Sequence, residues 1–491
     1  MKILLIQPPV TILRTEARKC HPPLGLAYIA ASLKDEFEVY VLDAVAEGYK
    51  TEETAGREHI RHGLALDAIK KRIAEISPGL VGVSSLFSSQ VENVYRVCQA
   101  VKEIDNNIVT VVGGIHPTVE PKEVMGNRYV DFIIMGEGEE TFKKLAHRIG
   151  SKEDISGLES VGFKSGVGSV TINPAAKYCQ NLDSIPFPYW DIFPLKKYFE
   201  ISNPHGSPVK RTPFLPIITS RGCPFECIFC SVHTLWGSTY RKRSSRNVLD
   251  ELEHIISRFG VREILFEDDN LTLDANRATE IFDGMIAGAM NVTWSTPNGV
   301  AVQTLDEGML TLMKRSGCRA ISVGIESGDE GMLKNVIKKP LLLSHAKSII
   351  NKAVRLGLEV SAFFVVGCPG ETVKTLKNTF RFARMLGGVN VNFFFATPLP
   401  GTRMLEVCRK ERMVDGPLDY VKLKSERPYF GTAGLSRESL IALVRRERLK
   451  LYLLFVLFHP IRFLNKVWHK LIFDPRYFFR FKSGYLRPRH D

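Results

Sequence analysis

The residues with the clearest chemical potential are three cysteines in one short loop. Cys223, Cys227 and Cys230 lie within eight residues of one another, in the segment SRGCPFECIFC at 220–230. Thiolates at these spacings can converge on one inorganic centre, and no fourth cysteine lies nearby in the sequence. A structural zinc site is normally closed by four protein ligands. Three thiolates therefore favour a 4Fe-4S cluster with one iron open to a substrate, and a zinc knuckle is the alternative.

An apolar segment directly precedes this loop, and similar segments recur along the chain. Six of them alternate with helical stretches over residues 211–436, at 215–219, 263–266, 292–295, 320–325, 360–366 and 389–395. Alternating strands and helices predict a partial parallel barrel, in which chemistry gathers at the carboxyl ends of the strands. The second strand ends in Glu267 and Asp268, the fourth in Gly324, Glu326 and Ser327, and the fifth in Gly367.

A second set of alternating segments occupies residues 1–150. Strands are expected at 2–7, 38–42, 80–84, 108–112 and 132–135, with helices at 22–33, 66–76 and 91–104. This order predicts a doubly wound, Rossmann-like parallel sheet, whose ligands bind beyond the strand carboxyl ends. Small or permissive residues stand at those ends, and tight turns alone would also explain them. These residues are Ser84, Ser85, Leu86, Gly113, Gly114, Gly136 and Glu137.

The cysteine spacing, with glycine before Cys223 and Phe229 before Cys230, resembles the cluster loop of the radical S-adenosylmethionine superfamily. The resemblance implies that the three cysteines bind a 4Fe-4S cluster whose open iron chelates S-adenosylmethionine. It also implies that electron transfer from the cluster yields a 5′-deoxyadenosyl radical.

The same resemblance assigns roles to strand ends of the barrel. Glu267 or Asp268 would face the S-adenosylmethionine ammonium group, and Glu326 and Ser327, which follow Gly324, would face its ribose. Gly367 begins a Gly-x-Pro-Gly-Glu-Thr turn that lies near the adenine in relatives. No catalytic residue beyond these cofactor ligands is assigned.

The N-terminal unit, including its PPLGL segment at 22–26, resembles the cobalamin-binding domain that often precedes a radical S-adenosylmethionine domain. Many such domains carry an Asp-x-His-x-x-Gly loop whose histidine ligates cobalt. Here Asp43 begins the corresponding segment and Val45 stands at the histidine position. No imidazole ligand is therefore expected from this loop, and a domain that has lost cobalamin is the alternative. His116 is interpreted as a turn histidine.

A connector at 151–210 is expected between the two units, with a hairpin over 161–173 and a proline-interrupted strap over 181–191. The chain has nine cysteines in 491 residues, and its first residues contain no secretory signal. Both features favour a reducing, cytoplasmic environment over a disulfide framework.

The net charge of +13 is concentrated in the tail. Residues 437–491 hold 13 Lys and Arg against 4 Asp and Glu, so the preceding 436 residues contribute only +4. Arg462, Lys466 and Lys470 fall on one face of an expected helix, with apolar residues and Trp468 on the other. This pattern is typical of a helix lying in a membrane interface, and a helix docked on the barrel is the alternative. Nucleic-acid binding is not expected.

The resulting hypothesis is a cobalamin-dependent radical S-adenosylmethionine enzyme of the class B methyltransferase type. Its resemblance implies methylation of an unactivated carbon in a small or lipid-like substrate, with flavodoxin or ferredoxin as reductant. The alternatives are a radical oxidation, cyclisation or rearrangement without methyl transfer, and a zinc-stabilised, membrane-associated scaffold. Methylthiolation of tRNA would require a second set of cluster cysteines, which Cys20 and Cys98 do not supply.

Overall fold

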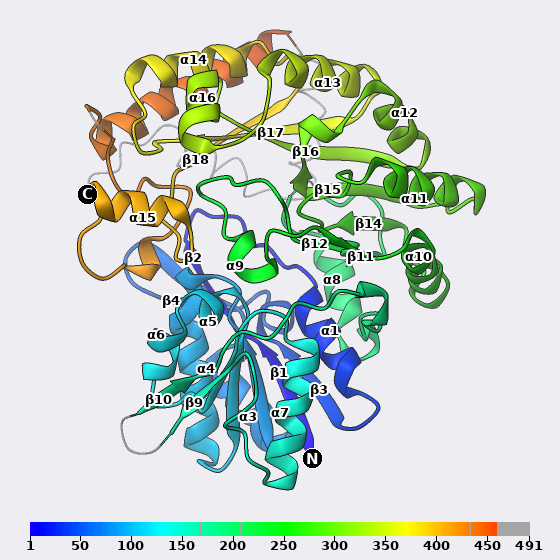
Figure 1. Cartoon of the computed structure of the whole chain (residues 1–491), viewed down its shortest axis with the longest axis vertical. Coiled ribbons are helices and arrows are strands. Elements are labelled where there is room, and N and C mark those ends of the chain that lie inside the picture. The colour runs from blue at the N-terminus through cyan, green and yellow to red at the C-terminus, as the bar shows by residue number, and fades with distance from the viewer. Residues whose placement is uncertain (166–168, 207, 433, 459–491) are drawn as a thin grey trace.

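The structure is a computed structural model that describes residues 1–165, 169–206, 208–432 and 434–458. Two helix-flanked sheets make up most of it. Figure 1 shows the first sheet in the lower half of the view, the second in the upper half, and α9 (Val232–Trp236) between them. Among the described residues, no helix has both the length and the apolar character needed to cross a bilayer.

The first sheet has seven strands in the order β10-β9-β8-β7-β6-β1-β3. Its five parallel strands are β1 (Lys2–Gln7), β3 (Glu38–Asp43), β6 (Leu80–Ser84), β7 (Val109–Gly113) and β8 (Phe132–Ile134). Taken in chain order these strands lie 2-1-3-4-5, the flavodoxin-like arrangement, in which ligands bind where the strand order reverses. That point lies between β1 and β6.

Helices cover both faces of this sheet, as its uninterrupted apolar strands require. They are α1 (Leu24–Leu33), α2 (Ala44–Glu47), α3 (Leu66–Ile76), α4 (Val91–Ile104), α5 (Ile115–Val119), α6 (Pro121–Gly126) and α7 (Glu139–Ser151). The expected hairpin is confirmed as β9 (Val161–Lys164) and β10 (Val170–Ile172), which pair antiparallel and extend the sheet beyond β8.

The second sheet has six parallel strands in the order β11-β14-β15-β16-β17-β18. They are β11 (Phe214–Ile217), β14 (Glu263–Phe266), β15 (Thr293–Val300), β16 (Cys318–Glu326), β17 (Glu359–Val366) and β18 (Asn390–Phe395). Each matches one of the six predicted segments to within a few residues. The sheet is an open arc, and Figure 1 shows its helices along the outer side. The helices are α10 (Ser245–Phe259), α11 (Ala275–Ala287), α12 (Glu307–Arg315), α13 (Leu343–Arg355) and α14 (Val373–Arg384).

Aromatic side chains fill the space between this arc and its helices. Trp294 on β15 is fully buried, stacks on Phe282 of α11 with ring centroids 5.0 Å apart, and meets Phe266 of β14 edge-on. Its indole nitrogen donates to the Ser316 carbonyl at 3.1 Å. Such pairs add to the area they bury, and they fix β14 and β15 against α11.

Smaller elements complete the described chain. A three-stranded antiparallel sheet, which was not predicted from the sequence, consists of β2 (Val10–Leu13), β5 (His59–His62) and β4 (Glu52–Thr54). The remaining α-helices and strands are α8 (Leu195–Ile201), β12 (Ser220–Arg221), β13 (Arg241–Lys242), α15 (Arg403–Lys410) and α16 (Arg437–Phe458). The predicted basic face at 462–470 lies outside the described residues.

Two glycines near the ends of barrel helices give a test of how tightly the arc is packed. Gly317 has φ +104°, and a Cβ there would lie 2.4 Å from the Val292 carbonyl oxygen. Gly357 has φ +73°, and the nearest atom to its Cβ would be Lys314 Nζ at 3.8 Å. Alanine at Gly357 meets only backbone strain, whereas alanine at Gly317 must also move the main chain before β15.

We predict that Gly357→Ala lowers the free energy of unfolding by roughly 1 to 2 kcal/mol through left-handed strain. Gly317→Ala is expected to cost ~2 kcal/mol more, because overpacking against backbone is added to strain. Urea titrations followed by tryptophan fluorescence measure both variants. Equal losses would contradict the close approach of Gly317 to Val292.

Candidate active site

The three-cysteine loop lies between β12 and α9 and is held by its own backbone. Gly222 has φ +86°, and a Cβ there would lie 2.3 Å from the Thr239 carbonyl oxygen, so only glycine fits before Cys223. The Ile228 amide donates to the Ile337 carbonyl at 3.0 Å, and the Ile228 carbonyl accepts from the Met404 amide at 2.9 Å. These backbone contacts fix the shape of the loop around the three cysteines.

The thiols of this loop fit a polynuclear cluster better than a single ion. All three cysteines are half-buried and free of disulfides. Burial raises the pKa of the Cys227 thiol to about 11 and that of Cys230 to about 12, and it raises that of Cys223 as well. A cationic centre is therefore needed to hold them as thiolates. Among the described residues, only a different trio brings three donor atoms within 4.8 Å of one another. A structural zinc site is normally closed by four protein ligands, so three thiolates fit a 4Fe-4S cluster with one open iron better than a zinc knuckle.

A lysine that the sequence analysis missed lies beside these thiols. Lys339 Nζ is 2.8 Å from Glu326 Oε1, and both side chains are about nine-tenths buried. Burial opposes its charge, but Glu326 and the thiols of Cys227 and Cys230 outweigh that effect and raise the pKa of Lys339. The KKP segment at 338–340 gave no sign of this role, since a lysine pair is usually solvated.

Glycine at position 324 makes room for this ion pair. A Cβ there would lie 2.1 Å from Glu326 Oε1 and 2.8 Å from Lys339 Nζ. Glu326 itself has φ +65°, an uncommon left-handed conformation for a residue other than glycine. Strained residues of this kind persist where the surroundings over-determine them, often at functional sites. The structure thus brings Gly324 and Glu326 together with the cysteine loop.

The three carboxylates in the acidic turn after β14 contact three different sets of partners. Asp268 is buried and accepts hydrogen bonds from the Thr219 amide and hydroxyl and from the Ser220 hydroxyl, so it anchors the start of the cysteine loop. Glu267 contacts the imidazoles of His21 and His205. Neither of these predicted residues turns toward the thiols.

Asp269, which the sequence analysis passed over, is the carboxylate that interacts electrostatically with the thiols of Cys223 and Cys230. Its Oδ2 atom is buried and has no hydrogen-bond partner. Burial, and then the charge of Asp268, raises the pKa of Asp269 to about 7. An unpaired buried acceptor beside the cysteine loop fits a cationic ligand such as the ammonium group of S-adenosylmethionine.

The ends of β16 and β17 hold their polar groups in structural bonds. The Ser327 hydroxyl lies 3.1 Å from Thr379 Oγ1 on α14 and accepts from the Asp329 amide at 3.2 Å. The Gly367 amide donates to the carboxylate of Glu371. Glu371 is 1% exposed, and burial raises its pKa to about 8. These bonds shape the strand ends that the sequence analysis had assigned to ribose and adenine.

The carboxyl end of β6 offers an apolar surface. Leu86 is 47% exposed and Phe87 61% exposed, although both follow a buried strand. Ser84 is half-buried, and Ser85 is almost fully buried with an unpartnered hydroxyl. Two exposed apolar side chains beside an unpaired polar atom, at the point where the strand order reverses, fit a large flat ligand with polar edges such as cobalamin.

Glycines at the ends of the neighbouring strands leave open space beyond this edge of the sheet. A Cβ at Gly113 or at Gly136 would meet nothing within 4 Å, so space lies open above both. Gly114 is required for a different reason, since it has φ +117° and a Cβ there would lie 2.7 Å from the Ser85 carbonyl oxygen. Val45 packs in the core instead of facing a ligand.

His116 is fully buried and engaged at both ring nitrogens. Nδ1 lies 3.0 Å from the Ser88 hydroxyl and Nε2 lies 3.0 Å from Glu123. No lone pair is left for cobalt, although the residue lies in α5 and not in the turn that was predicted from the sequence.

Glu137, predicted to contact cobalamin, instead joins the two sheets. Its carboxylate lies 3.0 Å from Arg221 Nη1 and 2.7 Å from Arg241 Nη1, and it accepts from the Cys179 amide at 2.7 Å. Glu139 makes a second bond to Arg221. Arg221 directly precedes the cysteine loop, so these ion pairs fix the end of β8 against that loop.

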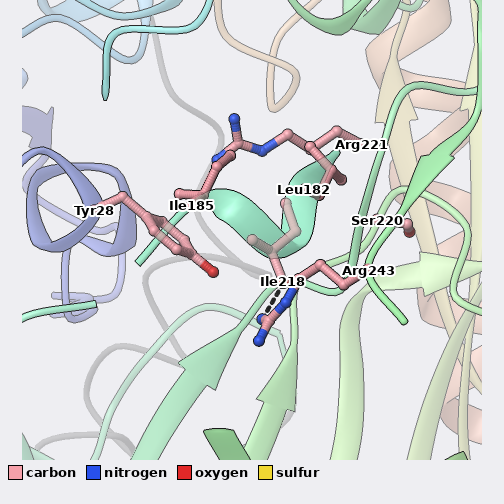
Figure 2. Close-up of a pocket in the computed structure, with 7 residues that line it drawn as sticks. All are labelled: Tyr28, Leu182, Ile185, Ile218, Ser220, Arg221 and Arg243. Carbon is pink, nitrogen blue, oxygen red and sulfur yellow. Dashed lines mark hydrogen bonds between the residues drawn. The ribbon is translucent and has the colours of Figure 1, made fainter. Parts of the chain in front are cut away.

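A small cavity lies behind Arg221 at this junction. Figure 2 shows Tyr28 of α1 and Arg221 on opposite sides of it, with the Arg243 guanidinium bonded to the Ile218 carbonyl at 3.1 Å. Its volume of about 10 Å³ is no larger than one water molecule needs. It is therefore a packing gap and not a substrate site.

Comparison with known proteins gives two domain matches. The B12 binding domain family matches residues 10–146, and the radical SAM superfamily matches residues 217–383. The chain is 32% identical to the cytidylyl-2-hydroxyethylphosphonate methyltransferase of Streptomyces wedmorensis, over 88% of this chain and 86% of the relative. It is 28% identical to the anaerobic magnesium-protoporphyrin IX monomethyl ester cyclase of Rubrivivax gelatinosus, over 82% of this chain and 68% of the relative.

The fold is similar to that of OxsB, a cobalamin-dependent S-adenosylmethionine radical enzyme solved with aqua-cobalamin and S-adenosylmethionine bound. The TM-score is 0.69 at 17% sequence identity, over 88% of this chain and 64% of OxsB. At that identity the likeness concerns the fold alone.

The raised pKa of Glu371 gives a test of the β17 turn. Because its folded pKa of about 8 exceeds the ordinary value of 4.5, the native state binds a proton that the unfolded chain releases. This contribution to stability is fully present below about pH 4.5 and is lost as the pH rises through about 8, at roughly 1.4 kcal/mol per pH unit in between. Glu371→Gln keeps the acceptor for Gly367 and removes the titration.

We predict that the thermal midpoint of Glu371→Gln, relative to wild type, rises steadily between pH 5 and 8. Glu330→Gln, at an exposed position, is the matched control and is expected to show no such trend. Parallel midpoint curves for wild type and Glu371→Gln across this range would show that Glu371 is not held as a buried acid.

Proposed function

Because the chain belongs to the family of enzymes that join a B12-binding domain to a radical S-adenosylmethionine domain, we propose that it methylates an unactivated carbon of a small or lipid-like substrate. The family includes methyltransferases, and its cofactors are a 4Fe-4S cluster, S-adenosylmethionine and cobalamin. When bound, these groups supply a radical initiator and a methyl carrier.

The observation that carries the proposal is the ion pairing of Glu137 and Glu139 with Arg221. These bonds hold the carboxyl end of the first sheet against the residue that precedes the cysteine loop. The side chain of Val119 on α5 also packs against the turn after β18. A Cβ at Gly401 in this turn would lie 2.7 Å from Val119 Cγ1. A substrate between the two sheets would therefore be reached from both cofactor sites.

The chain's own residues have defined tasks in this scheme. Cys223, Cys227 and Cys230 would hold the cluster, and Asp269 would accept hydrogen bonds from the S-adenosylmethionine ammonium group. Glu326, held by Lys339, would face the ribose from the end of β16. Leu86 and Phe87 would pack against cobalamin and exclude water from its face, since both present exposed apolar side chains at the end of β6.

A second candidate function is radical cyclisation or oxidation without methyl transfer. It is favoured by the 28% identity to the Rubrivivax gelatinosus cyclase. The two reactions differ in the mass of the product, because only methylation adds a carbon atom.

An enzyme of this family needs a reductant as well as a substrate. We propose a one-electron carrier such as flavodoxin or ferredoxin in the cytoplasm. We also propose that α16 holds the enzyme at the inner face of the membrane. Along this helix Leu449, Leu453 and Leu457 recur every four residues and are 45%, 57% and 71% exposed. Lys377, Arg381, Arg446 and Lys450 line an adjoining groove between α14 and α16 and would attract anionic headgroups.

The cofactor assignment predicts a double dissociation. After anaerobic reconstitution, the triple variant Cys223→Ala, Cys227→Ala, Cys230→Ala is expected to lose four irons and keep cobalamin. Phe87→Asp is expected to do the reverse, weakening cobalamin binding at least tenfold, because a charge replaces its apolar contact. Iron and cobalt analysis with absorption spectra measures both.

Matched controls are Cys179→Ala, at another half-buried cysteine, and Val170→Asp, at an exposed apolar residue on β10. Both should retain both cofactors. A wild-type enzyme that binds the cluster without cobalamin would overturn the methyl-transfer proposal. If both cofactors bind, a product with the same number of carbon atoms as the substrate would favour the second candidate.

The membrane proposal predicts binding to vesicles with anionic lipid and not to neutral ones. The double variant Leu453→Glu, Leu457→Glu should reduce sedimentation with anionic vesicles at least tenfold. Leu342→Glu, at a residue 67% exposed that directly precedes α13 and lies outside α16, is the control that should not change it. Equal sedimentation of both variants would contradict a membrane role for α16.

A further inference from the structure

Two histidines and a glutamate from three separate segments meet at the domain junction. His21 lies before α1, His205 lies in the connector between α8 and β11, and Glu267 follows β14. One donor atom from each residue lies within 4.8 Å of the other two. No other trio of His, Cys, Asp or Glu among the described residues is this close.

The distances within this trio match those between ligands of one metal ion. His205 Nε2 lies 3.0 Å from Glu267 Oε2, and His21 Nε2 lies 3.5 Å from Glu267 Oε1. Metal bonds of 2.0 to 2.2 Å at a tetrahedral angle separate their donor atoms by about 3.4 Å. Imidazole with carboxylate is a donor set suited to zinc and neighbouring transition metals, and less to magnesium or calcium.

The trio also contains polar atoms that the protein itself leaves unsatisfied. Glu267 is 8% exposed, yet its Oε1 atom is buried without a hydrogen-bond partner. Nδ1 of His21 is likewise buried and unpartnered. A buried carboxylate oxygen without a partner is costly, and a cation bonded to it would remove that cost.

Backbone contacts hold the three segments in place around these side chains. The Cys20 amide donates to the Asn203 carbonyl at 3.0 Å, which joins the segment of His21 to that of His205. Gly206 follows His205 with φ +73°, and a Cβ there would lie 2.5 Å from Pro297 Cβ. The arrangement is therefore built by the fold and does not depend on the side chains alone.

Asn298 supplies a further oxygen next to the trio. Its Oδ1 lies 3.2 Å from His205 Nε2, while its Nδ2 donates to the Glu267 carbonyl at 2.9 Å. That second bond fixes which way the amide points, so its oxygen faces the histidine.

We propose that His21, His205 and Glu267 bind a single divalent transition-metal ion of the zinc class, separate from the three-cysteine loop. Three protein ligands leave at least one coordination position for water or for an oxygen of a substrate. The ion joins the N-terminal domain, the connector and the barrel, and it lies two residues along the chain from Asp269. The inference does not depend on the methyl-transfer proposal.

The test uses the full chain in two forms. In the triple variant Cys223→Ala, Cys227→Ala, Cys230→Ala, which removes the thiols that would bind zinc adventitiously, zinc is added, excess is removed by gel filtration and metal is quantified. One zinc per chain is expected. Adding His205→Ala, at a residue 40% exposed, should weaken zinc binding at least 100-fold.

The matched control is His147→Ala. This substitution breaks the pair between His147 and Glu36, which has no third residue able to bind a metal among the described residues. It should leave one zinc bound. Zinc should also raise the thermal midpoint of the control and not that of His205→Ala. In the reconstituted wild-type protein, one zinc is expected in addition to four irons, which guards against misfolding of the triple variant. Zinc absent from both forms, or retained with His205→Ala, would overturn the proposal and leave the trio as a hydrogen-bonded polar contact.

Discussion

The arrangement of this enzyme depends on the buried charge of Arg221. Its side chain is 4% exposed and lies against the rings of Tyr28 and Trp236, so water cannot stabilise it. Glu137 and Glu139, at the end of β8 and the start of α7, supply the compensating charge. Removing one partner of such a pair typically costs about 3 to 5 kcal/mol. Because Arg221 directly precedes Gly222, these ion pairs tie the cysteine loop to the B12-binding domain.

Parallel sheets impose the second constraint, since all their strands deliver side chains to one edge. When two such edges meet, two cofactor sites come together without any long loop to bridge them. Crowding then restricts the backbone. Gly222 approaches the main chain at Thr239, Gly114 approaches it at Ser85, and Gly324 leaves room for the Glu326–Lys339 pair. Side chains at these glycines would displace the site itself.

The strands of both sheets could be predicted from the sequence because each is a short, continuous apolar run bounded by turns, and this signal is local. The β2-β5-β4 sheet was missed because β2 is far from β5 in sequence, and because β4 and β5 consist mostly of polar residues. The directions of the side chains at the strand ends could not be predicted from the sequence either. Glu137 occupies a typical ligand position, yet its charge is needed by Arg221 and Arg241. Lys339 carries no motif, and only the tertiary contact of its segment with Ile228 brings it to the thiols.

The turn after β14 shows why sequence pattern and function diverge at such ends. Three successive carboxylates would repel one another if they shared one environment. The fold separates them: Glu267 meets the imidazoles of the connector and the N-terminal domain, Asp268 meets the hydroxyls that begin the cysteine loop, and Asp269 meets the thiols. One turn, at the end of a single strand, therefore positions three parts of the chain relative to one another. A shift of β14 by one residue would exchange these partners, so the register of this strand determines the chemistry available at the site.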